Sequence, residues 1–375
     1  MGNNNQIYRA KLGKKKFGTL KEYSDDFIAF LDNGNPLFPD SVQESYVMTS
    51  IYGYFYFIKN EIEKEVESVI SRKNEITQGD VKQITSNIII KHYENWKNAD
   101  LLPSIPNSHT ENIINKYNKN IEEAIFEIFE KLPLYKRHSD QLKEIAGTLF
   151  SKSYIIPDTV SGVVIAGFGE IDVFPSLRRY VIEGVANNRL KYTEIPPVEI
   201  NFETHASIIP IAQREMVDTF MMGVDPSYME LEESYITEIF SEYTDIITNN
   251  INKYDTKEKL KLKKKLLKVS NEILKDHQEK LRIYRKETYT NPVTSVVSML
   301  PKDELAAMAE ALVNLTSFKR KVSMETETVG GPIDVAVISK GDGFIWIKRK
   351  HYFKPELNPG FFANYYKEEI EDGEK

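Results

Sequence analysis

Histidine and cysteine are the side chains from which metal sites and thiol chemistry are built, and this 375-residue chain is poor in both. It has no cysteine and six histidines, which are His92, His109, His138, His205, His277 and His351. The histidines do not fall at metal-ligand spacing, and the pattern His-Glu-x-x-His does not occur. The lack of cysteine excludes thiolate nucleophiles, disulfides and iron–sulfur clusters. The sequence therefore predicts no metal and no cofactor.

Hydroxyl nucleophiles and nucleotide-binding loops have no better support. Ser295, Ser298 and Ser323 lie in no nucleophile elbow. The segment 167–169 reads Gly-Phe-Gly and does not extend to GxGxxG, and no Walker A pattern occurs. Gly330-Gly331 precedes an apolar run, where two glycines permit a turn with positive φ or a close approach of backbone. The favoured interpretation is a helix-to-strand turn, and the alternative is a loop that contacts a ligand.

A run of basic residues is the strongest charge feature. It comprises Lys257, Lys259, Lys261, Lys263, Lys264, Lys265 and Lys268. Their spacing distributes them over several faces of a helix, which favours a solvated helical surface over a binding stripe. The whole chain carries 49 Lys+Arg against 56 Asp+Glu, and its net charge of −7 does not suit binding driven by counterion release. We therefore predict no nucleic-acid partner.

The composition is that of a globular protein, with 41% hydrophobic and 28% charged residues. No apolar stretch reaches the roughly 18 residues of a membrane span, and the first residues lack the apolar core of a signal peptide. These features predict a soluble, cytoplasmic protein without a membrane partner.

Residues 1–154 are predicted to be helical, because apolar residues recur at intervals of three and four. Thr19 with Glu22 is typical of a capping box, and Thr77 with Asp80 is predicted to begin a later helix. Residues 155–228 change pattern. A continuous apolar run at 162–168 predicts a strand buried on both faces, and 176–182 and 189–193 predict two more strands joined by a turn at 183–188. This is a β-meander, followed by a helix.

Residues 229–290 are predicted to form an antiparallel helical hairpin, with Asp255 and Glu258 at the start of its second helix. Two apolar rows follow on that helix: Leu260, Leu267, Leu274 and Leu281 in one, and Leu262, Leu266, Val269 and Ile273 in the other. Two rows are wider than a two-helix seam requires. The hairpin is therefore predicted to bind a second copy or another protein; the alternative is that the excess packs on the rest of the chain.

Residues 291–353 are predicted to hold a helix over 301–319 and two strands over 333–338 and 344–348, with Asp342-Gly343 as the turn signal between them. Residues 354–375 are predicted to be a tail.

Two parts of the chain, about 160–225 and 300–350, together resemble proteasome β-type N-terminal-nucleophile (Ntn) hydrolases. The resemblance lies in Gly162–Gly169 with Pro175–Tyr180 and the turn at Gly184, in Pro210–Gln213 with its helix, and in a late helix followed by Thr328–Ile338 and Asp342–Phe344. It implies an α+β fold with a partial four-layer αββα sandwich to which large helical segments are added. Gly167, Gln213, Gly330 and Gly331 match structural turn positions of the family.

The resemblance also implies which functional parts have no counterpart. Family members begin with a Thr, Ser or Cys nucleophile that opens a strand, whereas this sequence begins Met1-Gly2-Asn3-Asn4 and is predicted to enter a helix. Ala212 stands where the family usually has serine, and Val329 stands where it has serine before Gly-Gly. No catalytic residue is therefore expected.

Three hypotheses follow. The first is a non-catalytic Ntn-like scaffold or interaction protein. The second is a truncated Ntn hydrolase, a threonine peptidase or amidohydrolase whose nucleophile strands are absent from this sequence. The third is a helical interaction protein unrelated to the family.

Overall fold

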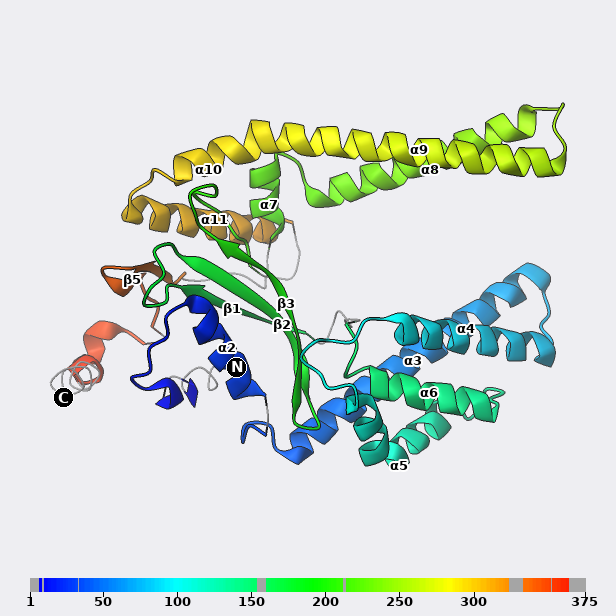
Figure 1. Cartoon of the computed structure of the whole chain (residues 1–375), viewed down its shortest axis with the longest axis horizontal. Helices are drawn as coiled ribbons and strands as arrows, with labels where there is room; N and C mark the ends of the chain where they lie inside the picture. Colours follow the sequence, from blue (N-terminus) through cyan, green and yellow to red (C-terminus); the bar gives the residue numbers. More distant parts are fainter. Residues whose placement is uncertain are drawn as a thin grey trace. The chain divides into compact units, whose positions relative to one another are not determined.

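The computed structural model describes residues 7–8, 10–32, 34–153, 160–211, 214–323, 333–351 and 353–363. The chain is an α+β protein, as expected (Figure 1). It divides into two compact units, Met1–Glu199 and Ile200–Lys375, and the division falls inside the predicted segment 155–228. Each unit is described by itself.

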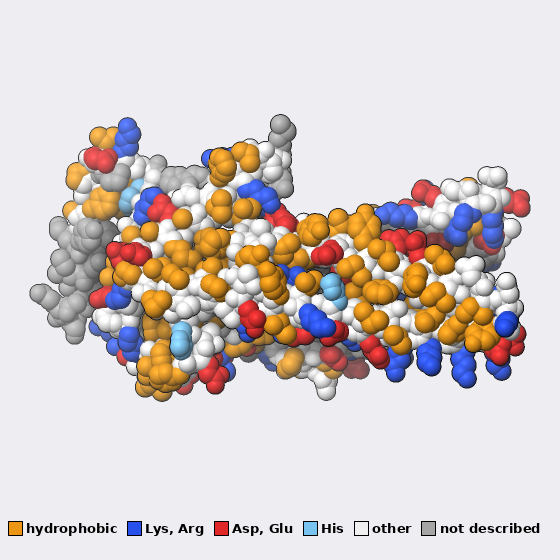
Figure 2. Space-filling model, turned by 90° about the horizontal axis from the view of Figure 1, so that it is seen from above, with side chains coloured by type: hydrophobic (Ala, Val, Ile, Leu, Met, Phe, Trp, Pro, Cys, Tyr) orange, Lys and Arg blue, Asp and Glu red, His pale blue; other side chains and the backbone are white. Residues whose placement is uncertain are grey.

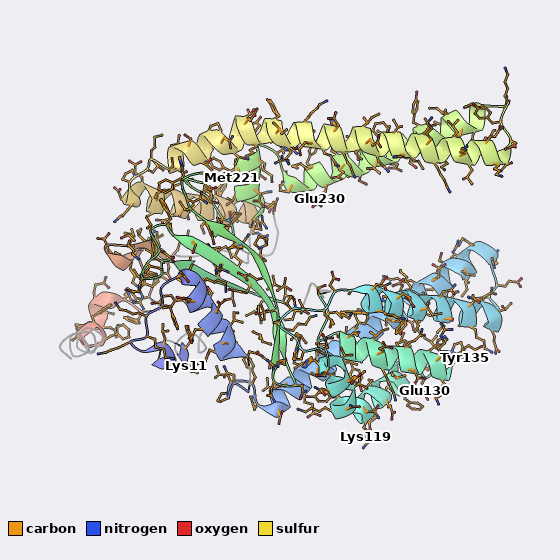
Figure 3. All side chains as sticks on the ribbon, in the orientation of Figure 1. Lys11, Lys119, Glu130, Tyr135, Met221 and Glu230 are labelled. Carbon is orange, nitrogen blue, oxygen red and sulfur yellow. The ribbon has the colours of Figure 1, made fainter. Side chains whose placement is uncertain are left out.

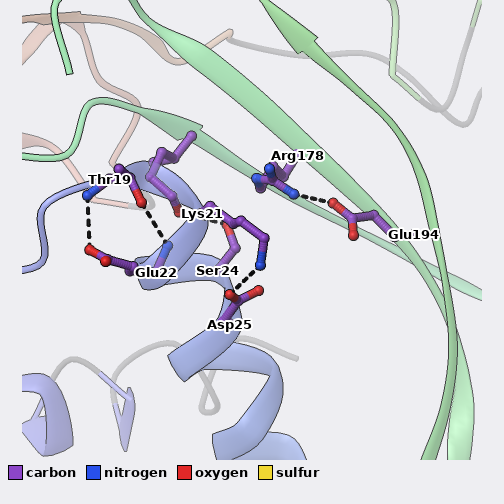
Figure 4. Close-up of polar contacts among 8 residues, drawn as sticks. Thr19, Lys21, Glu22, Ser24, Asp25, Arg178 and Glu194 are labelled. Carbon is purple, nitrogen blue, oxygen red and sulfur yellow. Dashed lines mark hydrogen bonds and ion pairs between the residues drawn. The ribbon is translucent and has the colours of Figure 1, made fainter. Parts of the chain in front are cut away.

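The first unit combines a helical bundle with a small sheet. Its helices are α2 (Leu20–Leu31), α3 (Asp40–Lys73), α4 (Gln78–Asn98), α5 (His109–Phe129) and α6 (Lys136–Thr148). The two predicted helix starts are confirmed. Thr19 and Glu22 form a capping box on α2, drawn in Figure 4, and Thr77 and Asp80 form one on α4. Each box satisfies backbone N–H groups that the first helical turn leaves without partners.

The bundle core is built from the apolar stripes that face each other across α3 to α6. Ile51, Phe55 and Ile58 of α3 are fully buried among Ile121 of α5 and Leu142 of α6. Gly147 lets α5 and α6 approach closely, because a Cβ at this position would lie 2.8 Å from the Thr110 carbonyl oxygen. Glu130 and Tyr135 flank the connection between these two helices (Figure 3).

The sheet of the first unit is the predicted antiparallel meander. It consists of β1 (Ser161–Gly167), β2 (Ser176–Ala186) and β3 (Arg189–Glu199) in the order β1-β2-β3. The turn is shorter than the predicted 183–188, because β2 continues to Ala186 and only Asn187 and Asn188 connect the strands. Their φ values of 45° and 60° are those of a two-residue hairpin turn, which asparagine tolerates.

The prediction that the 162–168 strand is buried on both faces is wrong. β1 is an edge strand, and Val163, Val164 and Ile165 are only half-buried. Val163 and Ile165 pack with Phe27 and Leu31 of α2, so one face of this part of the strand is covered. A short apolar run cannot by itself distinguish these two environments. On the neighbouring strands, Arg178 pairs with Glu194 (Figure 4).

The second unit contains five α-helices and a β-hairpin among its described residues. These elements are α7 (Glu215–Met222), α8 (Pro226–Asn250), α9 (Thr256–Arg285), α10 (Asn291–Val297), α11 (Lys302–Val322), β4 (Val335–Ser339) and β5 (Gly343–Lys348). The predicted turn between the two strands is confirmed: Gly343 has φ 70°, and the Asp342 N–H donates to the Ser339 hydroxyl over 3.1 Å. Met221 and Glu230, labelled in Figure 3, mark the end of α7 and the first turns of α8.

Three buried histidines should make the stability of the first unit depend on pH. Desolvation lowers the pKa of His92, of His109 and of His138. Below the unfolded pKa near 6.5, the unfolded chain therefore binds protons that the folded chain does not, and the free energy of unfolding falls as pH falls. Each histidine contributes at most about 1.4 kcal/mol per pH unit. We expect urea unfolding to show lower stability at pH 5.5 than at pH 7.5.

The variant His109→Phe isolates one share of this effect. The Nε2 atom of His109 is buried and has no hydrogen-bond partner among the described residues. Replacement by phenylalanine therefore removes a titrating group without breaking a hydrogen bond at that atom. The difference in stability between the two pH values should shrink in this variant. If the difference in stability between the two pH values is unchanged, His109 has the same pKa in the folded and the unfolded state.

Candidate interaction surface on the α8–α9 hairpin

The two helices of the hairpin have well-defined starts. The Asp225 carboxylate caps α8 by accepting from the Ser227 N–H over 2.9 Å, and Pro226 follows it. Asp255 and Glu258 form the predicted capping box on α9. The five residues 251–255 connect the helices, so these lie antiparallel as neighbours (Figure 1).

The hairpin is anchored within the second unit by polar contacts at its base. The Thr290 hydroxyl, in the π-helical turn Lys286–Thr290 that follows α9, donates to the Met221 carbonyl over 2.9 Å and ties this turn to α7. Lys319 of α11 pairs with Glu215 of α7 and, at 3.6 Å, with the capping Asp225. These contacts fix the base of the hairpin.

The contact between the two helices is lined by small polar residues. Across residues 226–285, all of which the structure describes, only Thr244 and Thr248 are buried. Their hydroxyls donate to carbonyls of their own helix, those of Phe240 and Thr244, over 2.7 and 3.0 Å. A helix pair usually buries its largest apolar side chains at this seam. Here the fully buried positions are threonines, and the apolar side chains of Ile236, Phe240 and Ile247 on α8 are half-buried.

The large apolar side chains of α8 lie on its outer face. They are Tyr228, Leu231, Tyr235, Ile239, Tyr243 and Ile246, each more than half exposed. Steps of three and four residues keep them in one stripe along the whole helix. Thr248 comes two residues after Ile246, which is about 200° around the helix, so the stripe points away from α9. Ile239, Tyr243 and Ile246 therefore lie on the exposed face of α8 and not on the face toward α9.

The second predicted row on α9 is also accessible. Val269 and Ile273 are 44% and 51% exposed, and Leu262 and Leu266 are half-buried. Leu267, Leu274 and Leu281 of the heptad row are half-buried, whereas Leu260 is exposed. In Figure 2, which looks down on the hairpin as it lies in Figure 1, hydrophobic side chains follow its length and basic ones gather at one edge. Both helices thus contribute apolar surface.

The two helices carry opposite charge. α8 has six acidic residues and no basic one, and α9 has eleven basic residues and four acidic ones. Lys263 pairs with Asp245, and Lys259 donates to the Asn249 carbonyl over 3.3 Å, so these lysines turn toward α8. Lys257, Lys261, Lys264 and Lys268 recur at steps of three and four on another face. The prediction that the lysine run covers several faces is confirmed.

The family-matched positions do not form a site in the described residues. Gly167 ends β1 with φ 143°, a conformation that favours glycine. Gln213, Gly330 and Gly331 lie outside the described residues, so their predicted roles stay predictions.

A tyrosine–histidine–glutamate chain in the first unit is the arrangement most like a catalytic relay. The Tyr54 hydroxyl lies 2.8 Å from Nδ1 of His92, and Nε2 of His92 lies 3.0 Å from the Glu61 carboxylate. Desolvation would raise the pKa of Glu61, but hydrogen bonds from Lys91 and His92 outweigh it and lower that pKa. Tyr54 and His92 are both buried, and Tyr54 is part of the bundle core. This geometry joins α3 to α4, and the imidazole at its centre is buried.

Two adjoining cavities border α11 in the second unit. One of about 470 Å3 is lined by residues 207–211 and by Val217, Leu305 and Leu312, and one of about 580 Å3 lies beside α10 and α11. The described side chains that line them are apolar or carry only a hydroxyl, so among these residues neither cavity offers an acid, a base or a metal ligand. They are suited to packing and not to catalysis.

Two further features are absent from the described part of the chain. No three His, Asp or Glu side chains come together there in a way that could hold a metal ion. None of its helices combines the length and the apolar character that crossing a membrane requires.

The outer face of the hairpin is thus the candidate functional site, and only part of it could be predicted from the sequence. The apolar rows on α9 were visible as periodicity, but the outward direction of the α8 stripe was missed. The sequence feature that could have revealed this direction is the pair Thr244 and Thr248, which lie four residues apart and therefore share the seam face of α8. No protein-family model, no curated protein and no solved structure matches this chain.

Proposed function

We propose that this chain is a non-catalytic interaction protein that associates through the outer face of the α8–α9 hairpin. One observation carries the proposal: the hairpin buries threonines at its own seam and turns six large apolar side chains of α8 outward. Contiguous apolar surface of this kind marks protein interaction sites in soluble proteins. Tyrosine is also enriched at such interfaces, since its ring buries apolar area and its hydroxyl stays hydrogen-bonded.

The expected result is that Tyr235→Glu combined with Ile239→Glu abolishes association. Two carboxylates in the middle of the stripe must be desolvated on binding, which should cost about 3 kcal/mol and weaken association roughly a hundredfold. Mass by light scattering and a pull-down with the chain as bait measure the effect. Circular dichroism checks that both helices remain.

Ser234→Glu combined with Ser241→Glu is the matched control. It adds the same charge to exposed positions of the same helix outside the stripe. This control should associate like the parent. Equal loss in both variants would mean that added negative charge, and not the apolar stripe, is responsible. No loss in either would overturn the proposal.

An Ntn-like sandwich scaffold remains part of the proposal. It is supported by the position of Gly167 at the end of β1 and by the order of α11 before the β4–β5 hairpin, both of which agree with the resemblance. The hydrolase alternative has no described side-chain arrangement in its favour. A cytoplasmic location likewise stays a prediction, which cell fractionation would test.

A further inference from the structure

We propose that the partner of the hairpin is a basic amphipathic helix of another protein, which lies along the outer face of α8 as a third helix. The inference rests on the proposed function and names the chemistry of the partner. The apolar stripe of α8 gives the place of contact, and the carboxylates beside the stripe give the charge of the partner.

The stripe has the shape of a helix-packing ridge. From Tyr228 to Ile246 it runs roughly 27 Å along α8, at about 1.5 Å per residue. Its steps of three and four residues make a ridge that fits between the side-chain rows of a second helix. A helix has no free strand edge, so an extended peptide could not bind here through backbone hydrogen bonds. Because the ridge points away from α9, a further helix can lie on it while the seam between α8 and α9 stays closed.

Three carboxylates border the stripe. At about 100° per residue, Glu238 and Glu242 lie roughly 80° and 40° to one side of its centre, and Glu232 lies roughly 40° to the other side. Among the described residues, the ion pair of α8 joins Asp245 to Lys263 and leaves these three carboxylates without one. α8 has no basic residue that could offset them. A helix with Lys or Arg on both sides of its own apolar row would pair with all three.

The same carboxylates disfavour other occupants. A two-fold antiparallel contact between two α8 helices, centred midway between Tyr228 and Ile246, would bring Glu238 of each copy beside Glu238 of the other, and like charges so placed oppose association. Nucleic acids and anionic membranes present phosphates, which the same negative charge repels. A basic helix suits both parts of the surface, because the stems of Lys and Arg cover apolar side chains while their charged ends reach carboxylates.

Two designed peptides test the charge of the partner. Each has about 25 residues, enough for a helix longer than the stripe, with leucines that recur at steps of three and four. Lysines flank the leucine row in one peptide, and glutamates take their place in the other. Fluorescence anisotropy with the full chain should show roughly tenfold or tighter preference for the lysine peptide, because only its charges complement those beside the stripe.

Neutralising the three carboxylates should remove this preference. In the variant with Glu232→Gln, Glu238→Gln and Glu242→Gln, the lysine peptide should bind at most roughly threefold more tightly than the glutamate peptide. Both peptides should still bind through the apolar stripe, which also shows that the variant is folded.

Two further variants locate the contact. Ser234→Lys with Thr237→Lys and Ser241→Lys is the matched control, because it changes the net charge by the same amount at exposed positions roughly 120° or more from the centre of the stripe. This control should keep the preference for the lysine peptide. Tyr235→Ser with Ile239→Ser removes apolar surface without adding charge and should weaken binding of the lysine peptide roughly tenfold.

Several results would overturn the basic helix. Equal binding of the two peptides to the parent would do so and would leave the proposed function standing, since the stripe would still bind. A control that loses the preference as fully as the glutamine variant, or a serine variant that binds the lysine peptide like the parent, would show that the carboxylates or the stripe do not form the contact.

The mass of the chain separates this inference from the proposed function. A parent with twice the mass of the chain in light scattering, made monomeric by Tyr235→Glu with Ile239→Glu, would identify a second copy as the occupant. That result overturns the basic helix and keeps the proposed function. Failure of both peptides to bind overturns the basic helix as well, and the proposed function falls with it if the chain also shows no association that these two substitutions remove.

Discussion

Lys191→Met should destabilise the first unit by about 3–5 kcal/mol, the cost of breaking a buried ion pair by removal of one partner. The Lys191 ammonium lies 2.8 Å from the Glu183 carboxylate and donates to the Leu149 carbonyl over 2.8 Å. It also lies 5.8 Å from the ring centroid of Trp96. The side chains of Lys191 and Glu183 are only 1% and 5% exposed. Methionine would leave a carboxylate buried without a counter-charge.

The pKa directions agree with this cost. Desolvation raises the pKa of Glu183 and lowers the pKa of Lys191, although each partner's charge opposes the shift of the other. Burial thus disfavours the charged form of each group, and the charge of its partner offsets only part of that cost. The double variant Glu183→Gln with Lys191→Met should recover a large part of the loss, because no buried charge is left unpaired.

Urea unfolding followed by tryptophan fluorescence measures both variants. The chain has two tryptophans, Trp96 in the first unit and Trp346 in the second, so a Trp346→Phe background reports on the first unit alone. If the Lys191→Met variant is as stable as this background, the ion pair makes no net contribution to the free energy of unfolding. A double variant worse than Lys191→Met would show that Glu183 is not the group left uncompensated.

Gly147→Val should destabilise the same unit by about 3 kcal/mol through overpacking. A Cβ at this position would lie 2.7 Å from Cγ1 of Ile114 and 2.8 Å from the carbonyl oxygen of Thr110. The second contact is with backbone of α5, which a rotamer change cannot relieve, so the helices must separate. Valine would add two methyl groups to this overlap.

Gly53→Ala is the matched control, because Gly53 lies inside α3 with nothing within 4 Å of the position of its Cβ. Alanine there should stabilise the chain by about 0.5–1 kcal/mol through its higher helix propensity. The same denaturation experiment measures both variants. A neutral Gly147→Val variant would mean that α5 and α6 do not approach as closely as the structure shows.

Local features of this chain are determined by the sequence. Side-chain capping at Thr19, Thr77 and Asp255 depends on residues three apart, so the sequence alone places the starts of α2, α4 and α9. Helical periodicity likewise predicted that residues 1–154 are mainly helical, and short apolar segments with turn signals predicted the meander and the β4–β5 hairpin. These elements depend on interactions between residues that are close in the sequence, and the spacing of such residues can be read from the sequence directly.

Only the tertiary structure brings Glu183 and Lys191 together as a buried ion pair. Strand pairing passes from Ile182 opposite Tyr192 to Gly184 opposite Lys191, which leaves Glu183 as an extra residue in a β-bulge. A bulge changes the face on which a side chain lies, so alternation along the sequence cannot place this carboxylate beside the lysine. Gly184 makes room there for the ring of Tyr46, a residue far away in sequence.

The direction of the hairpin's apolar surface was also decided in three dimensions. Periodicity shows that α8 and α9 have apolar rows, but it does not tell which row meets the other helix. The fold places Thr244 and Thr248 at the seam, and their hydroxyls are satisfied within α8, so small residues allow close packing without an unpaired polar group. The sequence by itself determined that the hairpin has more apolar surface than it needs. Only the tertiary structure turned Tyr235, Ile239 and Tyr243 toward solvent, because side-chain direction depends on which faces the two helices bring together.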